Sequence, residues 1–423
     1  MTPAAYDARV RTAGLDLAPF RALRYAPGRV AGLADVTSPP YDVVVRPDGQ
    51  RALETADPHN IVRLILPPSP DRAAATLTAW RRAGVLVTDD LPALYVYEQR
   101  AAGTVVQRGL IGALRLTPPA ERTVLPHEDV MPDVVAERAA LLRATATNFE
   151  PLLLSYRGHA DDAAADLVER TAARAPDTSL TTDDGMAHRL WRVTDPAGQS
   201  AATRALAAHR ALIADGHHRW ATCLRLRDEH GARPPWDRTL VLLVDTARYP
   251  LRVQAIHRVL PGLAPADALG RLTGAFRVRH VTGPLDAALR FLDDTPGTAF
   301  LLAGAGTFHL LDRPDPALLD RTVPGGRPEA WRRLDATVLH ATLLDAVWRV
   351  PDRPGGIAYL HDAAAAVTQA ERLGGTAVLL RPVREDTVLA LAEQGVTMPR
   401  KSTSFGPKPA TGLVMRSLAD EED

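Results

Sequence analysis

Several residue types are scarce in this sequence, and each shortage excludes a class of function. Its 423 residues include one cysteine, Cys223, which allows neither an internal disulfide nor a zinc site built from several cysteines. No run approaches the roughly 18 apolar residues that a membrane-spanning helix needs, and residues 1–10 carry charges without an apolar signal core. We therefore expect a protein that remains in the cytoplasm and has no membrane partner.

The sequence also has no excess of charge of either sign. Lys plus Arg and Asp plus Glu number 50 each, and no stretch is basic enough to follow a phosphate backbone. The sequence therefore disfavours nucleic acid as a partner. With 46% hydrophobic residues, the chain is long enough to bury a sizeable core in two or three packed units.

Lysine and asparagine are rare in a way that marks positions. Arg supplies 48 of the 50 basic residues, and the two lysines, Lys401 and Lys408, lie in one segment, MPRKSTSFGPK. Because a compact ammonium differs in geometry from a guanidinium, this clustering indicates a specific need for lysine. The two asparagines, Asn60 and Asn148, are marked in the same way. The alternative is chance retention in a sequence of biased composition.

Strand-like and helix-like segments alternate along the chain. This pattern predicts an α/β protein, with α+β as the alternative, built on a mixed sheet with flanking helices in two lobes. We expect an extension at residues 1–18, a main lobe at 19–260, a second lobe at 261–418 and an acidic tail at 419–423. Among the predicted elements are a hairpin at 94–116, strands at 152–156, 211–215 and 240–244, and helices at 133–147, 160–173, 218–230 and 331–347.

The strongest local signal is ALIADGHHRW, in which a buried strand runs into a helix through Asp215–Arg219. Gly216 allows close backbone approach, and the free amides of a helix N-terminus attract phosphate. His217, His218 and Arg219 add side-chain donors at the same point. Asp215 ends the strand, where α/β proteins often place catalytic or metal-binding carboxylates. The alternative is structural, with Asp215 as a helix cap.

This turn resembles the turn shared by ParB, sulfiredoxin and the free serine kinases. Gly216, His218 and Arg219 match the Gly-Cys-His-Arg of sulfiredoxins, but His217 replaces the cysteine, which argues against sulfinate reduction. Asp215, Gly216, His217 and Arg219 match the Asp-Gly-His-Thr-Arg of the serine kinases, with His218 in place of threonine. The resemblance implies a ParB/sulfiredoxin-like core that holds nucleotide phosphates.

A wider resemblance covers residues 19–418. The chain is similar to the DUF1015 family of bacterial and archaeal proteins, a likeness that implies the architecture but no settled activity. It departs from the family pattern at Asp245, where an amide is more typical, and in the loop before His257 and Arg258. The matching blocks, in order, are PFRALRY, SPPYDVV, HNIVRL, VLPHE, LLRATATNFEPLLL, IADGHHR, LDATVLHATLL and MPRKSTSFGPK.

Phosphoryl transfer needs cationic donors around the moving group and a carboxylate that orients the attacking hydroxyl. Asp42, after the rigid Pro-Pro pair of SPPYD, and Asp215 are the candidate base and metal ligands; the alternative for SPPYD is a structural turn with Tyr41 buried. The candidate catalytic residues are Asp215, His217, His218, Asp42 and Glu128. The candidate phosphate ligands are Gly216, Arg219, Lys401, Ser402, Thr403 and Lys408, and the candidate substrate contacts are Tyr41, Asn60, Asn148, His257 and Arg258.

Three functions stay open at this point. The sequence favours a kinase that uses ATP or ADP with Mg²⁺ and phosphorylates a small hydroxyl compound, best represented by a free serine-like amino acid. The alternatives are a ParB-like nucleotide-binding switch and another phosphate-dependent enzyme, such as a hydrolase or a sugar-phosphate enzyme. We also expect the C-terminal loop to bring Lys401 to the Asp215–Arg219 turn. The acceptor, the nucleotide and the oligomeric state are not determined by the sequence.

Overall fold

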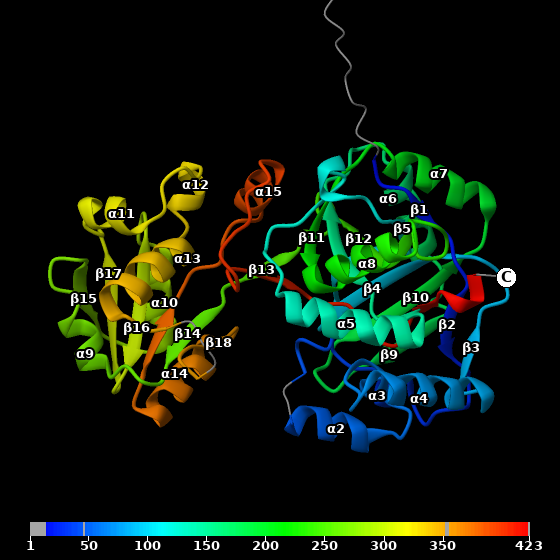
Figure 1. Cartoon of the computed structure of the whole chain (residues 1–423), viewed down its shortest axis with the longest axis horizontal. Coiled ribbons are helices and arrows are strands. Elements are labelled where there is room, and N and C mark those ends of the chain that lie inside the picture. The colour runs from blue at the N-terminus through cyan, green and yellow to red at the C-terminus, as the bar shows by residue number, and fades with distance from the viewer. Residues whose placement is uncertain (1–13, 45–46, 352–354, 422–423) are drawn as a thin grey trace, which may run out of the picture. The chain divides into compact units, whose positions relative to one another are not determined.

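The computed structural model describes residues 14–44, 47–351 and 355–421, which divide into two compact units (Figure 1). Unit 1 takes the described residues up to Leu125, Val130–Leu251 and those from Pro407 onward; unit 2 takes Pro126–Asp129 and Arg252–Gly406. Both units combine sheets with helices, which confirms the predicted mixed α/β class. Within the described residues, no helix is both long and apolar enough to cross a membrane.

Unit 1 is built on a mixed nine-stranded sheet with strand order β6-β11-β8-β12-β5-β4-β10-β9, and β1 pairs beside β5. Most neighbours are antiparallel, but β11 runs parallel to β6 and β12 runs parallel to β8. The predicted hairpin is confirmed as β4 and β5. The strands are β1 (Leu17–Ala18), β4 (Leu94–Ala101), β5 (Thr104–Arg115), β6 (Val124–Leu125), β8 (Leu152–Tyr156), β9 (Thr178–Thr181), β10 (Ala187–Val193), β11 (Ala211–Asp215) and β12 (Arg238–Asp245).

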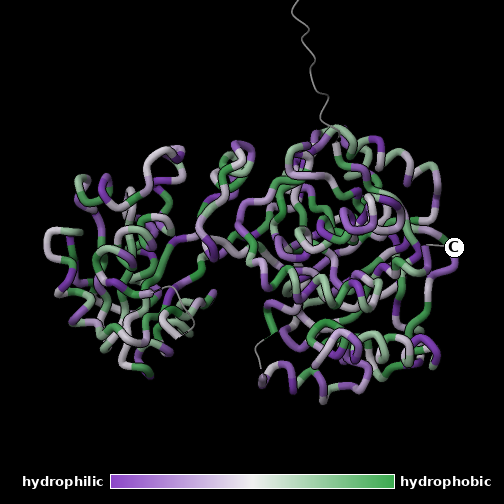
Figure 2. The backbone as a smooth tube through the Cα atoms, in the orientation of Figure 1, coloured by the Kyte–Doolittle hydropathy of each residue, from purple (hydrophilic) through white to green (hydrophobic). Residues whose placement is uncertain are grey.

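The middle of this sheet is apolar on both faces. Every residue of β8 and β11 is buried, as are all residues of β12 after Arg238. Such strands read as continuous apolar runs because neither face meets water, and Figure 2 shows these inner segments largely in the hydrophobic colour. A polar residue at the end of such a strand is therefore conspicuous, and Asp215 is one.

Helices cover the sheet of unit 1 (Figure 1). α5 packs on α8, and Trp220, Cys223 and Leu226 of α8 enter the core beside Ile213 of β11. α6 packs on α7. The bounds are α4 (Pro70–Arg82), α5 (Pro132–Thr145), α6 (Ala163–Ala172), α7 (Pro196–Leu206) and α8 (His217–Glu229), with shorter helices α1 (Leu33–Val36), α2 (Asp48–Ala56) and α3 (Val62–Ile65).

A small four-stranded sheet brings the C-terminal segment into unit 1. Its order is β3-β2-β21-β7, with β2 (Ala22–Tyr25), β3 (Leu86–Thr88), β7 (Thr147–Asn148) and β21 (Met415–Ser417). We expected residues up to 418 to belong with the second lobe. Residues 407–418 lie in unit 1 instead, because β21 pairs with both β2 and β7.

The predicted ends of the chain fall partly outside the described residues. Of the extension expected at residues 1–18, the structure describes residues 14–18, and Leu17–Ala18 forms β1 against β5. Of the acidic tail, residues 419–421 are described, and the Asp420 carboxylate lies 2.7 Å from Arg81.

Unit 2 is an antiparallel six-stranded sheet with the order β15-β17-β16-β19-β14-β18. A separate pair joins β13 (Arg252–Gln254) to β20 (Ser404–Gly406). The strands are β14 (His257–Leu260), β15 (Arg277–Val281), β16 (Ala299–Gly304), β17 (Thr307–Asp312), β18 (Ala358–Leu360) and β19 (Thr376–Leu379); the helices include α9 (Pro265–Gly270), α10 (Leu285–Asp293), α11 (Pro316–Thr322), α14 (Ala363–Leu373) and α15 (Glu385–Glu393).

The single helix predicted at 331–347 is wrong. The structure has α12 (Glu329–Arg332), α13 (Asp335–Val338) and a π-helical segment at Leu339–Trp348. Leu334 separates the first two because its backbone is extended, with φ −59° and ψ 131°. The sequence from Trp331 to Val347 contains no proline or glycine to signal the break.

Candidate functional site

The centre of unit 1 is the junction between β11 and α8. β11 ends at Asp215, α8 begins at His217, and Gly216 joins them with φ +100°. A Cβ atom on Gly216 would come within 3.2 Å of both the Arg219 guanidinium and the Leu152 side chain. Glycine is therefore required here by backbone conformation and by space.

The carboxylate of Asp215 is held between two cations. Its Oδ2 atom lies 2.7 Å from Arg219, and its Oδ1 atom lies 2.5 Å from the Nζ atom of Lys408. The same ammonium lies 3.1 Å from Oδ2 of Asp42. Three residues that the sequence marked separately, Asp42, Asp215 and Lys408, thus meet around one nitrogen atom.

Arg219 extends the network to Glu150. Its NH1 atom lies 3.4 Å from Glu150 Oε2, and the guanidinium is buried. Burial alone would lower the pKa of Arg219, but the carboxylates of Glu150, Asp215 and Asp42 outweigh it and raise this pKa. Burial raises the pKa of Glu150, against the opposing effect of Arg219. Removing either Glu150 or Arg219 would leave the other side chain's charge buried without this partner, which is destabilising.

Lys408 is charged for the same reason. Burial lowers the pKa of its ammonium, and the neighbouring Asp215 and Asp42 carboxylates more than reverse this, so its pKa lies above the ordinary value. Its side chain is 19% exposed, and that of Asp215 is 10% exposed. An ion pair so shielded from water is stronger than a surface pair.

The SPPYD turn is tied to this network by backbone contacts. The amide of Tyr41 donates to Glu150 Oε1 over 2.8 Å, and Arg138 lies over the Tyr41 ring at 4.4 Å. Ser38 and Thr411 exchange backbone hydrogen bonds across an isolated bridge. Asp42 is thereby placed next to the segment that carries Lys408.

Asn60 holds the approach to that turn. Its amide donates to the carbonyls of Asp35 and Thr37, and its Oδ1 atom accepts from the amide of Val62. The residue is fully buried. Asn60 thus has a structural role, since it holds the main chain at Asp35 and Thr37, just before SPPYD. Its proposed contact with substrate stays a prediction.

Residues 407–411, which we call the strap, are held by three buried polar side chains. Gln99 donates to the carbonyl of Lys408 over 3.0 Å, and Gln107 donates to the carbonyl of Pro407 over 2.8 Å. Gln99 and Gln107 face each other across β4 and β5. The hydroxyl of Tyr97, two residues before Gln99, accepts from the amide of Ala410. The main chain on both sides of the Lys408 side chain is therefore anchored to the sheet.

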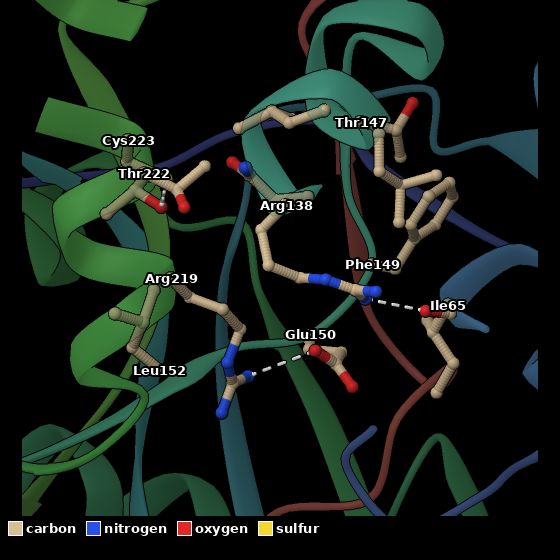
Figure 3. Close-up of a pocket in the computed structure, with 13 residues that line it drawn as sticks. Ile65, Arg138, Thr147, Phe149, Glu150, Leu152, Arg219, Thr222 and Cys223 are labelled. Carbon is tan, nitrogen blue, oxygen red and sulfur yellow. Dashed lines mark hydrogen bonds and ion pairs between the residues drawn. The ribbon is translucent and has the colours of Figure 1, made fainter. Parts of the chain in front are cut away.

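A cavity of about 60 Å³ adjoins Arg219 (Figure 3). Arg219 reaches from α8 toward Glu150, and Arg138 reaches from α5 to the carbonyl of Ile65, 2.7 Å away. Asn148 also lines the cavity. The remaining lining residues are mainly apolar or hydroxyl-bearing: Leu141, Leu142, Thr147, Phe149, Leu152, Thr222, Cys223 and Thr239.

The two histidines of the turn begin α8. His217 is buried, while His218 is partly exposed and its Nε2 atom accepts from the amide of Met131 over 3.1 Å. The first hydrogen bond of the helix runs from the amide of Trp220 to the carbonyl of Gly216. The preceding amides of the first turn have no partner within the helix, as at any helix N-terminus.

Asp42 and Asp215 do not form a resident metal site in this arrangement. The ammonium of Lys408 lies where the two carboxylates converge, and a second cation there would meet its charge. Across the described part of the chain, no group of three or more His, Cys, Asp or Glu side chains is placed to hold a metal ion. The magnesium ligands expected from the sequence are therefore engaged by lysine.

The other predicted site residues lie in unit 2. The amide of Lys401 donates to Glu128 over 3.0 Å, Thr403 lies 3.0 Å from His127, and the hydroxyl of Ser402 donates to the carbonyl of Pro399. The expected meeting of Lys401 with the Asp215 turn stays a prediction.

His257 and Arg258 are also in unit 2, on β14. The Nδ1 atom of His257 accepts from the amide of Leu380, and burial together with the neighbouring Arg258 lowers the pKa of this histidine to about 4. Arg258 is fully buried, 3.0 Å from His340 and over the ring of Tyr359. Both residues take part in the internal packing of unit 2.

Sequence reasoning missed Glu150 and the side chains that hold the strap, Gln99, Gln107 and Tyr97. Glu150 lies two residues after Asn148, in a block that the family resemblance had already marked, and a single carboxylate between Phe149 and Pro151 was a usable signal. Gln107 follows two valines in β5 and ends that apolar run, whereas Gln99 lies between Glu98 and Arg100 in β4 and gave no such signal. A polar residue at a position like that of Gln107 indicates a partner in the core.

Comparison with known proteins gives a family match and distant structural likenesses. A family model described as "Protein of unknown function (DUF1015)" matches residues 17–337, and no curated protein matches the chain. A free serine kinase variant in complex with ADP has 15% identity and a TM-score of 0.37, over 70% of this chain and 88% of that one.

Two further solved structures are similarly distant. SbnI with a C-terminal truncation, from Staphylococcus aureus, has 11% identity and a TM-score of 0.36, over 73% of this chain and 88% of its own. A conserved hypothetical protein from Pyrococcus furiosus has 16% identity and a TM-score of 0.34, over 70% and 93%. At these scores the likenesses assign no chemistry to the site.

Proposed function

This chain belongs to the DUF1015 family, and we propose that it is a nucleotide-dependent kinase that phosphorylates the hydroxyl of a small metabolite, with a free serine-like amino acid as the preferred acceptor. The observation that carries this proposal is the meeting of Asp42, Asp215, Lys408 and Arg219 at the start of α8. Fixed charges of both signs at a helix N-terminus suit the transfer of an anionic group to a hydroxyl.

The phosphate end of the nucleotide belongs at the first turn of α8. The N-terminus of a helix carries a partial positive charge that attracts anions, and Gly216 lets the ligand approach the backbone. Arg219 and Lys408 add formal charges beside this N-terminus. We propose that His217 and His218 complete this phosphate contact.

Asp42 is the better candidate for the base. Its side chain is 34% exposed, against 10% for Asp215, and it remains within reach of an incoming hydroxyl. In the proposed step, the acceptor oxygen forms a bond to the terminal phosphorus as the bond from that phosphorus to the nucleotide breaks. The hydroxyl proton passes to Asp42, and ATP leaves as ADP, or ADP as AMP.

Mg²⁺ would enter this reaction with the nucleotide. Magnesium keeps several waters and is commonly bound by substrate phosphates with few protein ligands. Arg219 and the amides of α8 bind and orient the phosphates, while Asp215 holds Arg219 and Lys408 in place.

Phosphorus NMR tests the proposal. The protein is incubated with Mg²⁺, ATP or ADP, and a panel of hydroxy amino acids, with L-alanine as the control that lacks a hydroxyl. We expect a new phosphomonoester signal with one hydroxylated acceptor and none with L-alanine. Release of inorganic phosphate alone would indicate a hydrolase, and nucleotide binding without turnover would indicate a switch; either result would overturn the kinase.

A further inference from the structure

The geometry around Lys408 resembles that of a metal ion between two carboxylates. One oxygen of Asp42 and one of Asp215 converge on the Nζ atom, at 3.1 Å and 2.5 Å. Paired carboxylates that converge in a partly buried site repel each other unless a cation lies between them. The cation in this protein belongs to the chain itself.

The lysine is built into that position. Gln107 holds the carbonyl before it, Gln99 holds its own carbonyl, and Tyr97 holds the amide of Ala410 two residues later. These three side chains are almost completely buried in the sheet, so moving the strap would break hydrogen bonds that cannot be replaced by water. A side chain that visits the site from a mobile loop would not need such anchors.

The charge balance shows what Lys408 prevents. Asp42, Asp215 and Glu150 place three carboxylates around Arg219. Without Lys408, the guanidinium groups of Arg219 and of Arg138, which also acts on Glu150, would leave one of these three negative charges uncompensated, and the pocket would attract divalent cations and repel free phosphate groups. With the lysine present, its ammonium and the two guanidinium groups balance the three carboxylates, so an anion at the helix N-terminus is no longer repelled by a net negative charge.

We propose that Lys408 is a resident cation that takes the place of a protein-bound divalent metal between Asp42 and Asp215. It is a positioning residue, since it acts on the nucleotide and the acceptor through the two carboxylates. The role assigned to the pair rests on the proposed kinase function, but the occupancy of the site by lysine does not.

Binding of Mn²⁺ in the absence of nucleotide tests this inference. Mn²⁺ is followed by the loss of its free signal in electron paramagnetic resonance, with the wild type, Lys408→Met and the control Lys401→Met. We expect Lys408→Met to bind one Mn²⁺ at least about tenfold more tightly than the other two proteins, because two carboxylates are released for the metal. Adding Asp42→Asn to Lys408→Met should abolish the gain.

The expected pattern can fail in two ways. Equal Mn²⁺ affinity in the wild type and folded Lys408→Met would overturn the proposal, and so would a gained site that survives Asp42→Asn. Circular dichroism establishes folding, since removing one partner of a buried ion pair destabilises a protein.

A second measurement uses the unaltered chain, in case Lys408→Met does not fold. The sequence has two lysines, so acylation by an amine-reactive ester can be followed at each by mass spectrometry. We expect Lys408 to react at least about tenfold more slowly than exposed Lys401, because burial and the two carboxylates keep its amine protonated and shielded. Asp42→Asn should accelerate its reaction.

Equal acylation rates at the two lysines would overturn the inference. None of these measurements involves nucleotide or acceptor. Phosphorus NMR without product would therefore reject the kinase and leave the resident cation intact. Product formation together with equal Mn²⁺ affinity or equal acylation rates would reject the resident cation and leave the kinase intact.

Discussion

Asp42 and Asp215 share one lysine but are held differently, and this difference assigns their roles. Asp215 contacts a cation at each of its two oxygens and is nearly buried, whereas Asp42 is about one-third exposed. A base must meet the hydroxyl and accept its proton, while an anchor must stay in place. The more exposed carboxylate is therefore expected to do the chemistry.

Asp42→Asn should lower kcat by about 100-fold or more while leaving nucleotide affinity within a few-fold, because the amide keeps its shape but cannot accept the proton. Steady-state kinetics and calorimetry measure the two quantities. Asp71→Asn, an exposed acidic position in the first turn of α4, is the matched control and should behave as the wild type. If Asp42→Asn keeps a normal kcat, Asp42 is not the base, and Asp215 becomes the candidate.

Gly216 sets the geometry of the turn, and its replacement can be compared with that of another glycine. Gly216 and Gly231 both have positive φ, but a Cβ would meet Arg219 and Leu152 at the first and nothing within 4 Å at the second. Gly231→Ala should cost about 1 kcal/mol of unfolding free energy, and Gly216→Ala should cost about 1 to 3 kcal/mol more. Urea denaturation measures both; equal losses would show that crowding is unimportant.

Single residues also show how far the sequence could predict the site. The Asp215–Arg219 turn was recognisable because its residues are consecutive and the strand before it is apolar. Lys408 stood out because lysine is rare, but its contact with Asp42 and Asp215 joins positions far apart in the chain. Such contacts depend on the assembled sheet, and residue type alone does not encode them.

The strap and the strands β4, β5 and β10 form the next level of organisation. Tyr97 accepts from Ala410 and lies 2.7 Å from the Nδ1 atom of His188 on β10, to which its hydroxyl can donate while that nitrogen is neutral. Thr182 lies 3.2 Å from the other ring nitrogen. This chain of hydrogen bonds connects the strap to a titratable group outside the candidate site.

Acid should weaken unit 1 through His188. Burial lowers the pKa of His188 to about 4, from an ordinary value of 6.5, so below pH 6.5 the unfolded chain takes up a proton that the folded chain refuses. Its stabilising contribution is complete above pH 6.5 and is lost as the pH falls toward 4. The loss amounts to about 3 kcal/mol at most.

Comparison with His188→Gln isolates this effect from that of His257, whose pKa is also about 4. Glutamine keeps an acceptor for Tyr97 but does not titrate. Denaturant unfolding of unit 1 between pH 7 and 4 should show a smaller loss of stability in the variant. Identical pH dependence in both proteins would exclude His188 as the source.

Elements were predicted well where periodicity is local. The strands at 152–156 and 211–215 and the helix that follows the turn were found because apolar runs and helical spacing are written in consecutive residues. The long helix at 331–347 was not, since the extended backbone of Leu334 that divides it has no signal in the neighbouring residues.

At the scale of the molecule, the sequence predicted two lobes but not the return of the C-terminal segment to the first. Ala22 pairs with Arg416, and Asn148 pairs with the same residue on its other side. Pairing over such separations follows from the closure of a sheet and leaves no pattern in any one segment. The residues between Arg252 and Gly406 thus interrupt unit 1 in sequence while it remains continuous in its hydrogen bonding.

Each unit has its own apolar core, and a matched pair of substitutions should separate them. Leu243 lies in the core of unit 1 and Leu343 in that of unit 2, and both are almost completely buried. Replacing either leucine by alanine should cost about 2 to 5 kcal/mol, because apolar contacts are lost and a cavity remains. Hydrogen exchange measured by mass spectrometry should then show faster exchange only in the unit that carries the substitution.

The strap, despite following unit 2 in sequence, should respond to Leu243→Ala and not to Leu343→Ala, since its hydrogen bonds go to Gln99, Gln107 and Tyr97. Loss of protection throughout the chain in both variants would mean that the two units unfold as one.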